Sequence, residues 1–260
     1  MLTIHETAQF LLAHDRYVIL THRRPDGDTA GSAAALCRGL RALGKTAAVL
    51  DNPQFTKKLR PYVAGLTCES AQPDSTVITT DIASEGLLSF GAEALAPRIE
   101  LVIDHHGSNS GYAYETLVDD GAAAAAELLT TLIPEMGAKI TPEIASCLYT
   151  GVATDTGCFR FSNTTAETHK AAAALIKAGA DVERLNERLF ESRSHARVIA
   201  ERMALESLEF YYDDRCALIC LTWDQIQAAG VAGAELEDLT SLPRSIEGVE
   251  VGLTLRQQKD

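Results

Sequence analysis

The sequence lacks a long hydrophobic run. Its apolar stretches are short and interrupted, as at residues 121–126, where a run of small residues meets Glu127. A membrane-spanning helix needs roughly 18–20 consecutive apolar residues, so no membrane span is predicted. The first residues, from Met1 to Glu6, also lack a basic start followed by an apolar stretch, so no secretory signal is predicted. We therefore expect a cytoplasmic protein that does not act on a membrane.

The sequence also lacks a disulfide framework. Most of its six cysteines lie inside apolar stretches, where a free cysteine packs as a small buried hydrophobe. Cys216 and Cys220 form the one pair with a spacing that merits consideration as metal ligands. They lie in an apolar run that is typical of a strand, and no second pair exists. We interpret this pair as core packing.

Positive charge is scarce. The chain has 23 Lys and Arg residues against 36 Asp and Glu residues, and its net charge is −13. Tight binding to long nucleic acid depends mainly on Lys and Arg, so the composition argues against an extended nucleic-acid track. It leaves room for a short nucleotide that is held locally. Clustered carboxylates that bind cations would also contribute to such an imbalance.

What the chain does have is an alternation of short apolar runs and helical patterns in its first half. Strands are predicted at Tyr17–Leu20, Thr46–Leu50, Thr76–Thr80 and Glu100–Ile103, and a helix at about Thr29–Leu43. Continuous apolar runs are typical of strands that are buried on both faces. Strands spaced by helices predict an α/β fold, with a mostly parallel sheet and flanking helices.

The second half is mainly helical at first. Thr141 followed by Pro142 predicts a helix start, and Thr165 predicts another helix, which ends at about Gly179. Residues 181–210 carry many charges at helical spacing. They are interpreted as a solvated linker of one or two helices, and the alternative is that some of their arginines face a phosphate-binding cleft.

A β-rich pattern returns after about Tyr211. Strands are predicted at 216–222 and 249–255, with a short helix near 224–229 between them. The predicted organisation is a main domain at 1–185, a helical linker at 186–210, and the start of a smaller α/β domain at 211–260. Because the chain stops directly after a strand, we expect this smaller domain to be incomplete.

Acidic residues and histidines follow the predicted strands. In an open α/β sheet, ligands bind beyond the carboxyl ends of the strands. Four segments have such positions: residues 21–28 with His22, Asp26 and Asp28, then Asp81, then Asp104-His105-His106, and Asp155 in a glycine-bounded loop after a helix. Each residue alone is weak evidence of a site, because aspartates often cap helices or occupy turns.

Carboxylates and imidazoles in this mixture suit Mn²⁺ best among the first-row ions, with Mg²⁺, Co²⁺ or Fe²⁺ as alternatives. One ion needs three or four ligands, so this set is large enough for two. Two ions about 3.5–4 Å apart can activate a water and stabilise charge in a phosphoryl displacement. The pattern therefore predicts a two-metal centre.

Residues 39–46 match the phosphate-binding P-loop pattern literally. A functional P-loop follows a strand and opens a helix. This segment closes a predicted helix and leads into a strand, so Gly44 is interpreted as a helix C-cap and not as part of an ATP site.

These segments together resemble a known family. Residues 22–32, from His22 to Ser32, resemble the first motif of the DHH phosphoesterases. Asp81 fits the second motif, Asp104-His105-His106 is similar to the signature that names the family, and residues 154–157 fit the fourth. The resemblance covers about residues 1–185. It implies a DHH catalytic domain there, and a DHH-associated, substrate-binding domain after the linker.

The resemblance also implies roles for individual residues. One metal would be held by His22, Asp26 and Asp81, and the other by Asp28, Asp81, His105 and Asp155, with Asp81 bridging. His106 would contact the scissile phosphate or assist the leaving group. Asp104 would orient an imidazole, as metal-bound histidines commonly require.

Within the family, residues 159–164 and 242–251 resemble the branch of nanoRNases and pAp phosphatases, which is related to RecJ nucleases. Arg160, Asn163 and Arg244 are therefore candidate substrate contacts, and structural pairing with nearby carboxylates is the alternative for the two arginines. In this branch the second domain carries a glycine-rich, histidine-containing motif that grips substrate. The chain ends before such a motif.

The resulting hypothesis is a two-metal, Mn²⁺-dependent phosphoesterase. Its substrates would be short RNA or DNA oligonucleotides, pAp or linear dinucleotides, and metal-activated water would be the nucleophile. The alternatives are a cyclic di-AMP phosphodiesterase, an inorganic pyrophosphatase of the same superfamily, or a non-catalytic module that binds nucleotides. A homodimer is expected from the resemblance alone.

Overall fold

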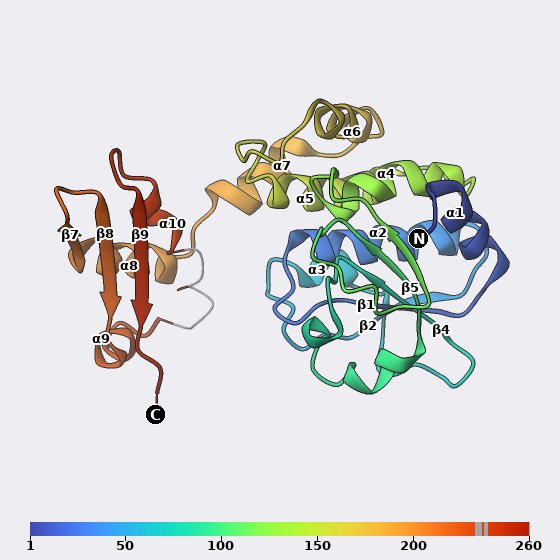
Figure 1. Ribbon diagram of the computed structural model, residues 1–260, viewed down its shortest axis with the longest axis horizontal. Coiled ribbons are helices and arrows are strands. Elements are labelled where there is room, and N and C mark those ends of the chain that lie inside the picture. Colours follow the sequence, from blue (N-terminus) through green and yellow to red (C-terminus); the bar gives the residue numbers. More distant parts are fainter. Residues whose placement is uncertain (232–235, 237–238, 260) are drawn as a thin grey trace. The chain divides into compact units, whose positions relative to one another are not determined.

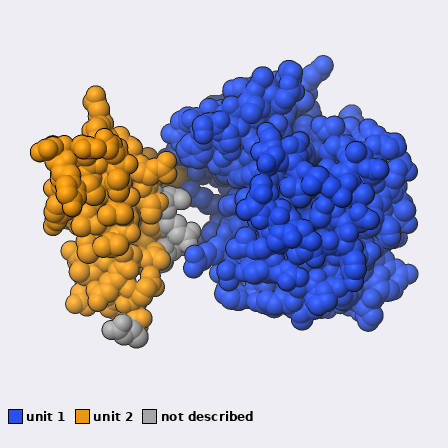
Figure 2. Space-filling view, in the orientation of Figure 1, with its two compact units in different colours: residues 1–191 blue, residues 192–260 orange. Residues whose placement is uncertain are grey.

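A computed structural model describes residues 1–231, 236 and 239–259. The chain forms two compact units, unit 1 at Met1–Glu191 and unit 2 at Ser192–Asp260, which Figures 1 and 2 distinguish. The predicted linker at 186–210 thus includes residues of both units. Its helix α8 (His195–Glu206) packs Ala200 and Ala204 into the apolar core of unit 2.

Unit 1 is built on a six-stranded sheet in which every neighbouring pair is parallel. Its strands are β1 (Tyr17–Leu20), β2 (Ala47–Leu50), β3 (Thr67–Cys68), β4 (Thr76–Thr80), β5 (Ile99–Asp104) and β6 (Glu115–Val118). Their spatial order is β3-β2-β1-β4-β5-β6, so the direction in which the sheet grows reverses between β1 and β4. The predicted α/β fold with a mostly parallel sheet is confirmed.

Both faces of this sheet are buried. Tyr17 and Ile19 of β1 belong to the larger apolar core, whereas the alternating residues Val18 and Leu20 belong to a second core on the opposite face. The larger core is covered by α2 (Gly27–Ala42), α4 (Ala125–Glu135) and α5 (Pro142–Asp155), with α6 (Ala166–Lys177) packed on α4 and α5 (Figure 1). Burial on both faces explains why β1 is a continuous apolar run.

The helices begin where capping side chains satisfy their first N–H groups. Asp26 caps α2 through the N–H groups of Asp28 and Thr29, so the helix begins at Gly27, two residues before the predicted start. Thr141 caps α5 with Pro142 in its first turn, and Thr165 caps α6, as predicted. Gly44, with φ +79°, follows α2 and precedes β2, so this segment does not open a helix as a P-loop does.

Small residues let α2 and α5 approach closely. A Cβ atom on Gly31 would lie 2.3 Å from the carbonyl oxygen of Cys147, and one on Gly151 would lie 2.4 Å from Asp28 Oδ1. Neither glycine can be replaced without movement of a backbone or of the buried Asp28 carboxylate. The contact places Asp28 of α2 and the last turn of α5 side by side.

Unit 2 has a three-stranded sheet in the order β7-β8-β9, with β7 (Leu208–Tyr211) antiparallel and β9 (Val251–Arg256) parallel to β8 (Cys216–Leu221). The predicted short helix is α9 (Trp223–Ala228), and α10 (Ser241–Arg244) precedes β9. The prediction of helix up to residue 210 is wrong at its end, because β7 begins at Leu208 and pairs with β8.

The remaining elements of unit 1 are short or irregular. They are α1 (Ile4–Ala13), α3 (Arg60–Val63), η1 (Glu85–Leu87), η2 (Glu93–Arg98), α7 (Val182–Asn186) and the π-helix η3 (Glu187–Glu191). Across the part of the chain that the structure describes, no helix is both long and apolar enough to cross a bilayer.

Candidate metal centre

Three strand ends bring acidic and imidazole side chains together at the point where the sheet reverses its order. His22 follows β1, Asp81 follows β4, and Asp104 is the last residue of β5. Ligand sites of open parallel sheets are expected at this edge. Asp155, predicted in a loop, is instead the last residue of helix α5. The loop prediction was wrong because the glycine that ends the helix is Gly157, with φ +55°, and not a residue before Asp155.

Asp81 lies at the middle of the cluster. Its side chain is almost fully buried and its two carboxylate oxygens face different histidines, with Oδ2 3.5 Å from His22 Nε2 and Oδ1 3.4 Å from His105 Nε2. Its backbone has φ +59°, a left-handed conformation that costs a non-glycine residue about 1–2 kcal/mol. Strain of this kind is typical of residues whose position the site requires.

The first group consists of His22, Asp26 and Asp81, whose ligand atoms lie within 4.8 Å of one another. His22 Nδ1 lies 2.7 Å from the carbonyl oxygen of Arg23. Because a carbonyl only accepts hydrogen bonds, Nδ1 carries a proton, and Nε2, whose lone pair would bind a cation, faces the carboxylates. Asp26 caps α2 with Oδ1, and its Oδ2 lies 3.5 Å from His22 Nε2.

The second group consists of Asp28, Asp81, His105 and Asp155. His105 Nε2 lies 3.9 Å from Asp28 Oδ2 and 3.2 Å from Asp155 Oδ2. Its Nδ1 lies 3.3 Å from the carbonyl oxygen of Ala122, which again leaves the Nε2 lone pair for the cluster. Asp81 belongs to both groups, so its carboxylate is shared by two sets of candidate ligands.

Asp28 also stabilises the fold. Its carboxylate accepts hydrogen bonds from the N–H groups of Ala125 and Ala126, at 2.6 Å and 3.0 Å, and from the Ser32 hydroxyl at 2.9 Å. Ala124, the N-cap residue of α4, offers no side-chain cap. Asp28 of α2 therefore caps α4 from a distance of almost a hundred residues in sequence. Burial, together with Asp81 and Asp155, raises the pKa of Asp28 well above its usual value.

The donor set fits divalent metal ions. Asp81 Oδ1 and His105 Nε2 are buried and have no hydrogen-bond partner among the described residues, although such buried polar atoms are normally paired. Atoms that share one ion at about 2.1 Å in octahedral positions lie about 3.0 Å apart. The nitrogen–oxygen separations of 3.2–3.9 Å around His105 approach that arrangement. Carboxylate oxygens and imidazole nitrogens are ligands that Mn²⁺ and related ions accept.

The electrostatics agree with this assignment. Burial lowers the pKa of His22, but Asp26 and Asp81 outweigh it and raise that pKa to about 11. Burial likewise opposes protonation of His105, whereas Asp155, Asp81 and Asp28 raise its pKa to about 11. Without a cation the cluster thus retains protons in the positions where ions would bind. A metal ion replaces those protons, so binding releases them.

His106 is held differently from His105. Its Nδ1 donates a 2.7 Å hydrogen bond to Asp104 Oδ1, and Asp104 Oδ2 accepts from Asn109 Nδ2 at 2.6 Å. This chain fixes the tautomer in which Nε2 of the half-exposed His106 is free to meet a substrate. The hydrogen bond to Asp104 is also the main cause that raises the pKa of His106. Sequence reasoning missed Asn109; an amide five residues after Asp104 was its only signal.

The predicted substrate contacts lie in different places. Asn163 Nδ2 donates to the carbonyl oxygens of Asp155 and Ala123, so this side chain ties the loop after α5 to the metal centre. Arg160 is exposed, and its Nε donates to the carbonyl oxygen of Gly157. Arg244 is exposed at the end of α10 in unit 2. All the other predicted site residues belong to unit 1.

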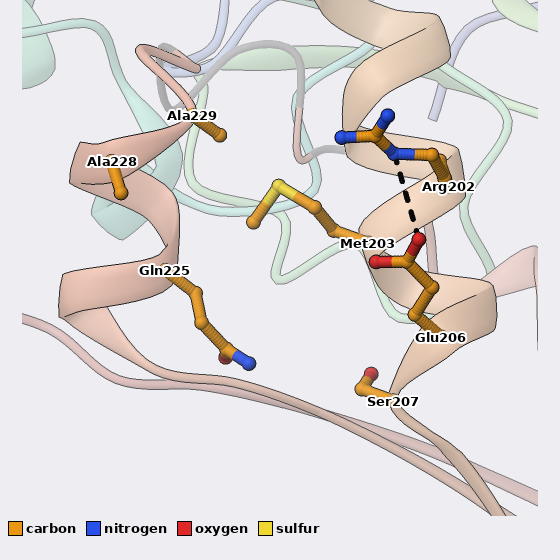
Figure 3. Close-up of a pocket in the computed structure, with 7 residues that line it drawn as sticks. All are labelled: Arg202, Met203, Glu206, Ser207, Gln225, Ala228 and Ala229. Carbon is orange, nitrogen blue, oxygen red and sulfur yellow. Dashed lines mark ion pairs between the residues drawn. The ribbon is translucent and has the colours of Figure 1, made fainter.

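Unit 2 also has a pocket between α8 and α9, shown in Figure 3. Met203 lies between the two helices, and Arg202 forms an ion pair with Glu206 at 3.7 Å. None of the residues predicted for the site lines this pocket. The candidate ligand groups found among the described residues all lie in unit 1.

Comparison with known proteins gives a consistent result. The family model described as "DHH family, N-terminal domain" matches residues 16–152. The chain is similar to the bifunctional oligoribonuclease and PAP phosphatase NrnA of Thermus thermophilus, with 34% identity over 93% of this chain and 72% of that protein. It is similar to the protein of the same name from Bacillus subtilis, with 23% identity over 98% of this chain and 82% of that protein.

Solved structures show the same fold. An exopolyphosphatase-related protein from Bacteroides fragilis superimposes with a TM-score of 0.89 at 24% identity, over 98% of this chain and 79% of that one. The family match spans the strands β1, β4 and β5 that position the cluster. The chain belongs to the DHH family and is a phosphoesterase.

Proposed function

We propose that this enzyme hydrolyses phosphoester bonds of short oligonucleotides and small nucleotides such as nanoRNA, pAp and linear dinucleotides, with two divalent cations. The observation that carries the proposal is Asp81, whose two oxygens face His22 on one side and His105 on the other. The names of the relatives, oligoribonuclease and PAP phosphatase, support this substrate class. Mn²⁺ is the proposed ion, with Mg²⁺ and Co²⁺ as alternatives.

Two ions held by His22, Asp26 and Asp81 on one side, and by Asp28, Asp81, His105 and Asp155 on the other, would activate a water and stabilise charge on the phosphoryl oxygens. The protein's own contribution is to fix these side chains. Backbone carbonyls hold both imidazole rings with their Nε2 lone pairs toward the carboxylates, and this orientation increases the affinity of a histidine for a metal.

His106 is proposed to contact the scissile phosphate or the leaving group. Asp104 and Asn109 keep its Nδ1 protonated and its ring in place, so Nε2 is the atom that can donate a proton to a departing oxygen. Its position beside His105, with ring centroids 4.3 Å apart, places it at the edge of the cluster. We propose Asp104 as its positioning residue and Arg160, Asn163 and Arg244 as further substrate contacts.

The test combines a substrate panel with one substitution. Wild-type enzyme with Mn²⁺ is given RNAs of two to five nucleotides, pAp, pApA, cyclic di-AMP and pyrophosphate, and products are separated by chromatography. We expect turnover of the short RNAs, pAp and pApA. In Asp81→Asn we expect activity to fall by more than about 100-fold and the calorimetric signal of Mn²⁺ binding to be lost.

The matched control is Asp120→Asn, which removes the charge of an exposed aspartate that belongs to none of the candidate ligand groups. It should retain activity and metal binding. Undiminished turnover in Asp81→Asn would rule out the assigned centre. Nucleotide binding without products would favour a binding module, and preferential turnover of cyclic di-AMP or pyrophosphate would replace the proposed substrate class.

A further inference from the structure

Two phenylalanines follow α5 and have opposite surroundings. Phe159 is half-buried, with its ring 5.3 Å from that of His169 and 6.0 Å from that of Tyr149. Phe161, two residues later, is 53% exposed. Phe159 is thus explained by packing between rings, whereas Phe161 leaves about half of its surface exposed.

The loop that presents Phe161 is fixed in an unfavourable backbone conformation. Gly157, Cys158 and Phe159 all have positive φ, at 55°, 59° and 62°, a region that residues with a side chain rarely adopt. Several hydrogen bonds keep the turn in place. Cys158 N–H donates to the carbonyl oxygen of Ala153 at 2.7 Å, and Phe161 N–H donates to that of Thr156 at 3.0 Å.

The ring of Phe161 lies against Gly157, in the turn that follows the candidate ligand Asp155. A Cβ atom on Gly157 would lie 2.4 Å from its Cζ, so the outer end of the ring contacts a position where only glycine fits. Gly157 is two residues from Asp155, and two peptide units span at most about 7.6 Å. The loop is tied to the centre a second time, because Asn163 donates to the carbonyl oxygen of Asp155 at 3.1 Å.

An apolar, exposed ring at this point has few suitable ligands. The centre itself offers carboxylates and imidazoles, which address the phosphate through cations. A nucleotide carries one flat apolar group, its base, which is one ribose away from the phosphate. Aromatic side chains stack on bases of any sequence, because every base has a π face. Arg160, whose Nε donates to the carbonyl oxygen of Gly157, adds a cation to the same turn.

We propose that Phe161 is a nucleobase platform, on which the base next to the scissile phosphate stacks, and that it makes the enzyme favour nucleotides over phosphoesters without a base. This inference rests on the proposed function and specifies how that site recognises its substrate. Stacking without hydrogen bonds to base edges also predicts that the four bases are accepted with similar KM values.

Binding is tested first, in an assay that needs no turnover. The chain has a single tryptophan, Trp223 in unit 2, so Phe161→Trp in a Trp223→Phe background places the only indole at the proposed platform. With Mn²⁺ present, AMP should quench its fluorescence with saturation, whereas ribose 5-phosphate, which has the same phosphate but no base, should not. Equal responses to both compounds would overturn the proposal.

Kinetics test the same point. For pApA, Phe161→Ala should raise KM about 5- to 100-fold with kcat within about twofold, and Phe161→Tyr should restore KM. For a dinucleotide with an abasic residue in place of one adenosine, the same variant should change little. Tyr114→Ala is the matched control, because Tyr114 is 77% exposed before β6, at the opposite edge of the sheet.

The outcomes separate this inference from the proposed function. If wild-type enzyme cleaves pApA but Phe161→Ala raises the KM for pApA and for the abasic dinucleotide equally, the platform is wrong and the function stands. If wild-type enzyme cleaves neither, the proposed function fails, and the fluorescence assay still decides whether Phe161 recognises a base. A loss of kcat without a change in KM would also overturn the platform.

Discussion

The two units use their sheets in different ways. Every residue of β1 in unit 1 is buried, because helices cover one face of the sheet and a second apolar core covers the other. In unit 2, β8 alternates: Ala217, Ile219 and Leu221 are buried, whereas the intervening residues are partly or fully exposed. The parallel sheet of unit 1 is thus a central layer, and the sheet of unit 2 is covered mainly on one face.

This difference explains where the chemistry lies. All strands of the unit 1 sheet run in the same direction, so their carboxyl ends share one edge, and His22, Asp81 and Asp104 meet there. The sheet of unit 2 is mixed: the carboxyl end of β7 lies at the edge opposite to that of β8, and only β8 and β9 share an edge for their carboxyl ends. A buried parallel sheet therefore gathers ligands from distant parts of the sequence, which a small mixed sheet cannot do to the same extent.

The largest effect should come from the close contact between α2 and α5, which is found in unit 1. Gly31→Ala would place a Cβ atom 2.3 Å from a backbone carbonyl oxygen of α5, and we expect a loss of about 3 kcal/mol in the free energy of unfolding. Gly39→Ala is the control in the same helix, because its Cβ would meet Ile133 at an ordinary 3.5 Å. For Gly39→Ala, urea denaturation should show an increase of about 0.5–1 kcal/mol in the free energy of unfolding. Equal losses in both variants would show that the helix contact is looser than described.

The second-largest effect is expected from metal removal, which should lower the stability of unit 1 and leave that of unit 2 unchanged. All candidate ligands found among the described residues lie in unit 1, so Mn²⁺ at about 100 times its Kd should stabilise unit 1 by about 2.7 kcal/mol. EDTA should remove this stabilisation. Hydrogen exchange measured on peptides from each unit should report the change in unit 1 alone. Equal changes in both units would mean that they unfold together, or that unit 2 supplies a ligand.

Within unit 1, Asp28 and Asp155 should respond differently to the same substitution. In EDTA, Asp28→Ala should lower the free energy of unfolding by about 2 kcal/mol, since it leaves the first N–H groups of α4 unpaired. Asp155→Ala should have a smaller effect, because its carboxylate faces His105 Nε2 at 3.2 Å and accepts from no backbone N–H among the described residues. Both variants should lose Mn²⁺ binding. Equal losses of stability would contradict the capping role of Asp28.

The metal affinity of unit 1 should also increase with pH. Below about pH 11 the metal-free cluster retains the protons of His22 and His105, whose pKa values are raised to about 11. A cation must displace them, so each released proton should strengthen Mn²⁺ binding up to tenfold per pH unit, or about 1.4 kcal/mol. Calorimetry in buffers with different ionisation enthalpies, between pH 6 and 8, counts these protons. An affinity independent of pH would show that the histidines are not ligands.

The contrast between fully buried and partly exposed strands also explains which strands the sequence alone predicts. Tyr17–Leu20 and Thr76–Thr80 were predicted with their observed bounds, since burial on both faces leaves a continuous apolar run. The edge strand β6 (Glu115–Val118) and the exposed strand β7 (Leu208–Tyr211) were not predicted. Neither shows a hydrophobic periodicity, and β7 directly follows a charged helix.

For the site, the place of a residue in the sequence indicated the candidate ligands, whereas contacts that form only in the fold could not be predicted. His22, Asp81 and His105 were indicated because they follow predicted strands, the full set of six was implied by the family resemblance, and the structure brings all six together. Asn109 and Gly151 were missed, because their importance depends on partners that only the fold brings near. Gly151 lies against Asp28, more than a hundred residues away, and no local pattern indicates that contact.

The smallest effect is expected on the outer face of unit 2. Leu253 of β9 is 46% exposed and pairs with Leu218, whereas Ile219 is fully buried. Leu253→Thr should change the free energy of unfolding by no more than about 0.5 kcal/mol, and Ile219→Val should cost about 1 kcal/mol. Chemical denaturation followed by Trp223 fluorescence measures both. A cost above about 1 kcal/mol for Leu253→Thr would mean that this face is covered in solution, and dependence of that cost on protein concentration would identify the cover as a second copy of the chain.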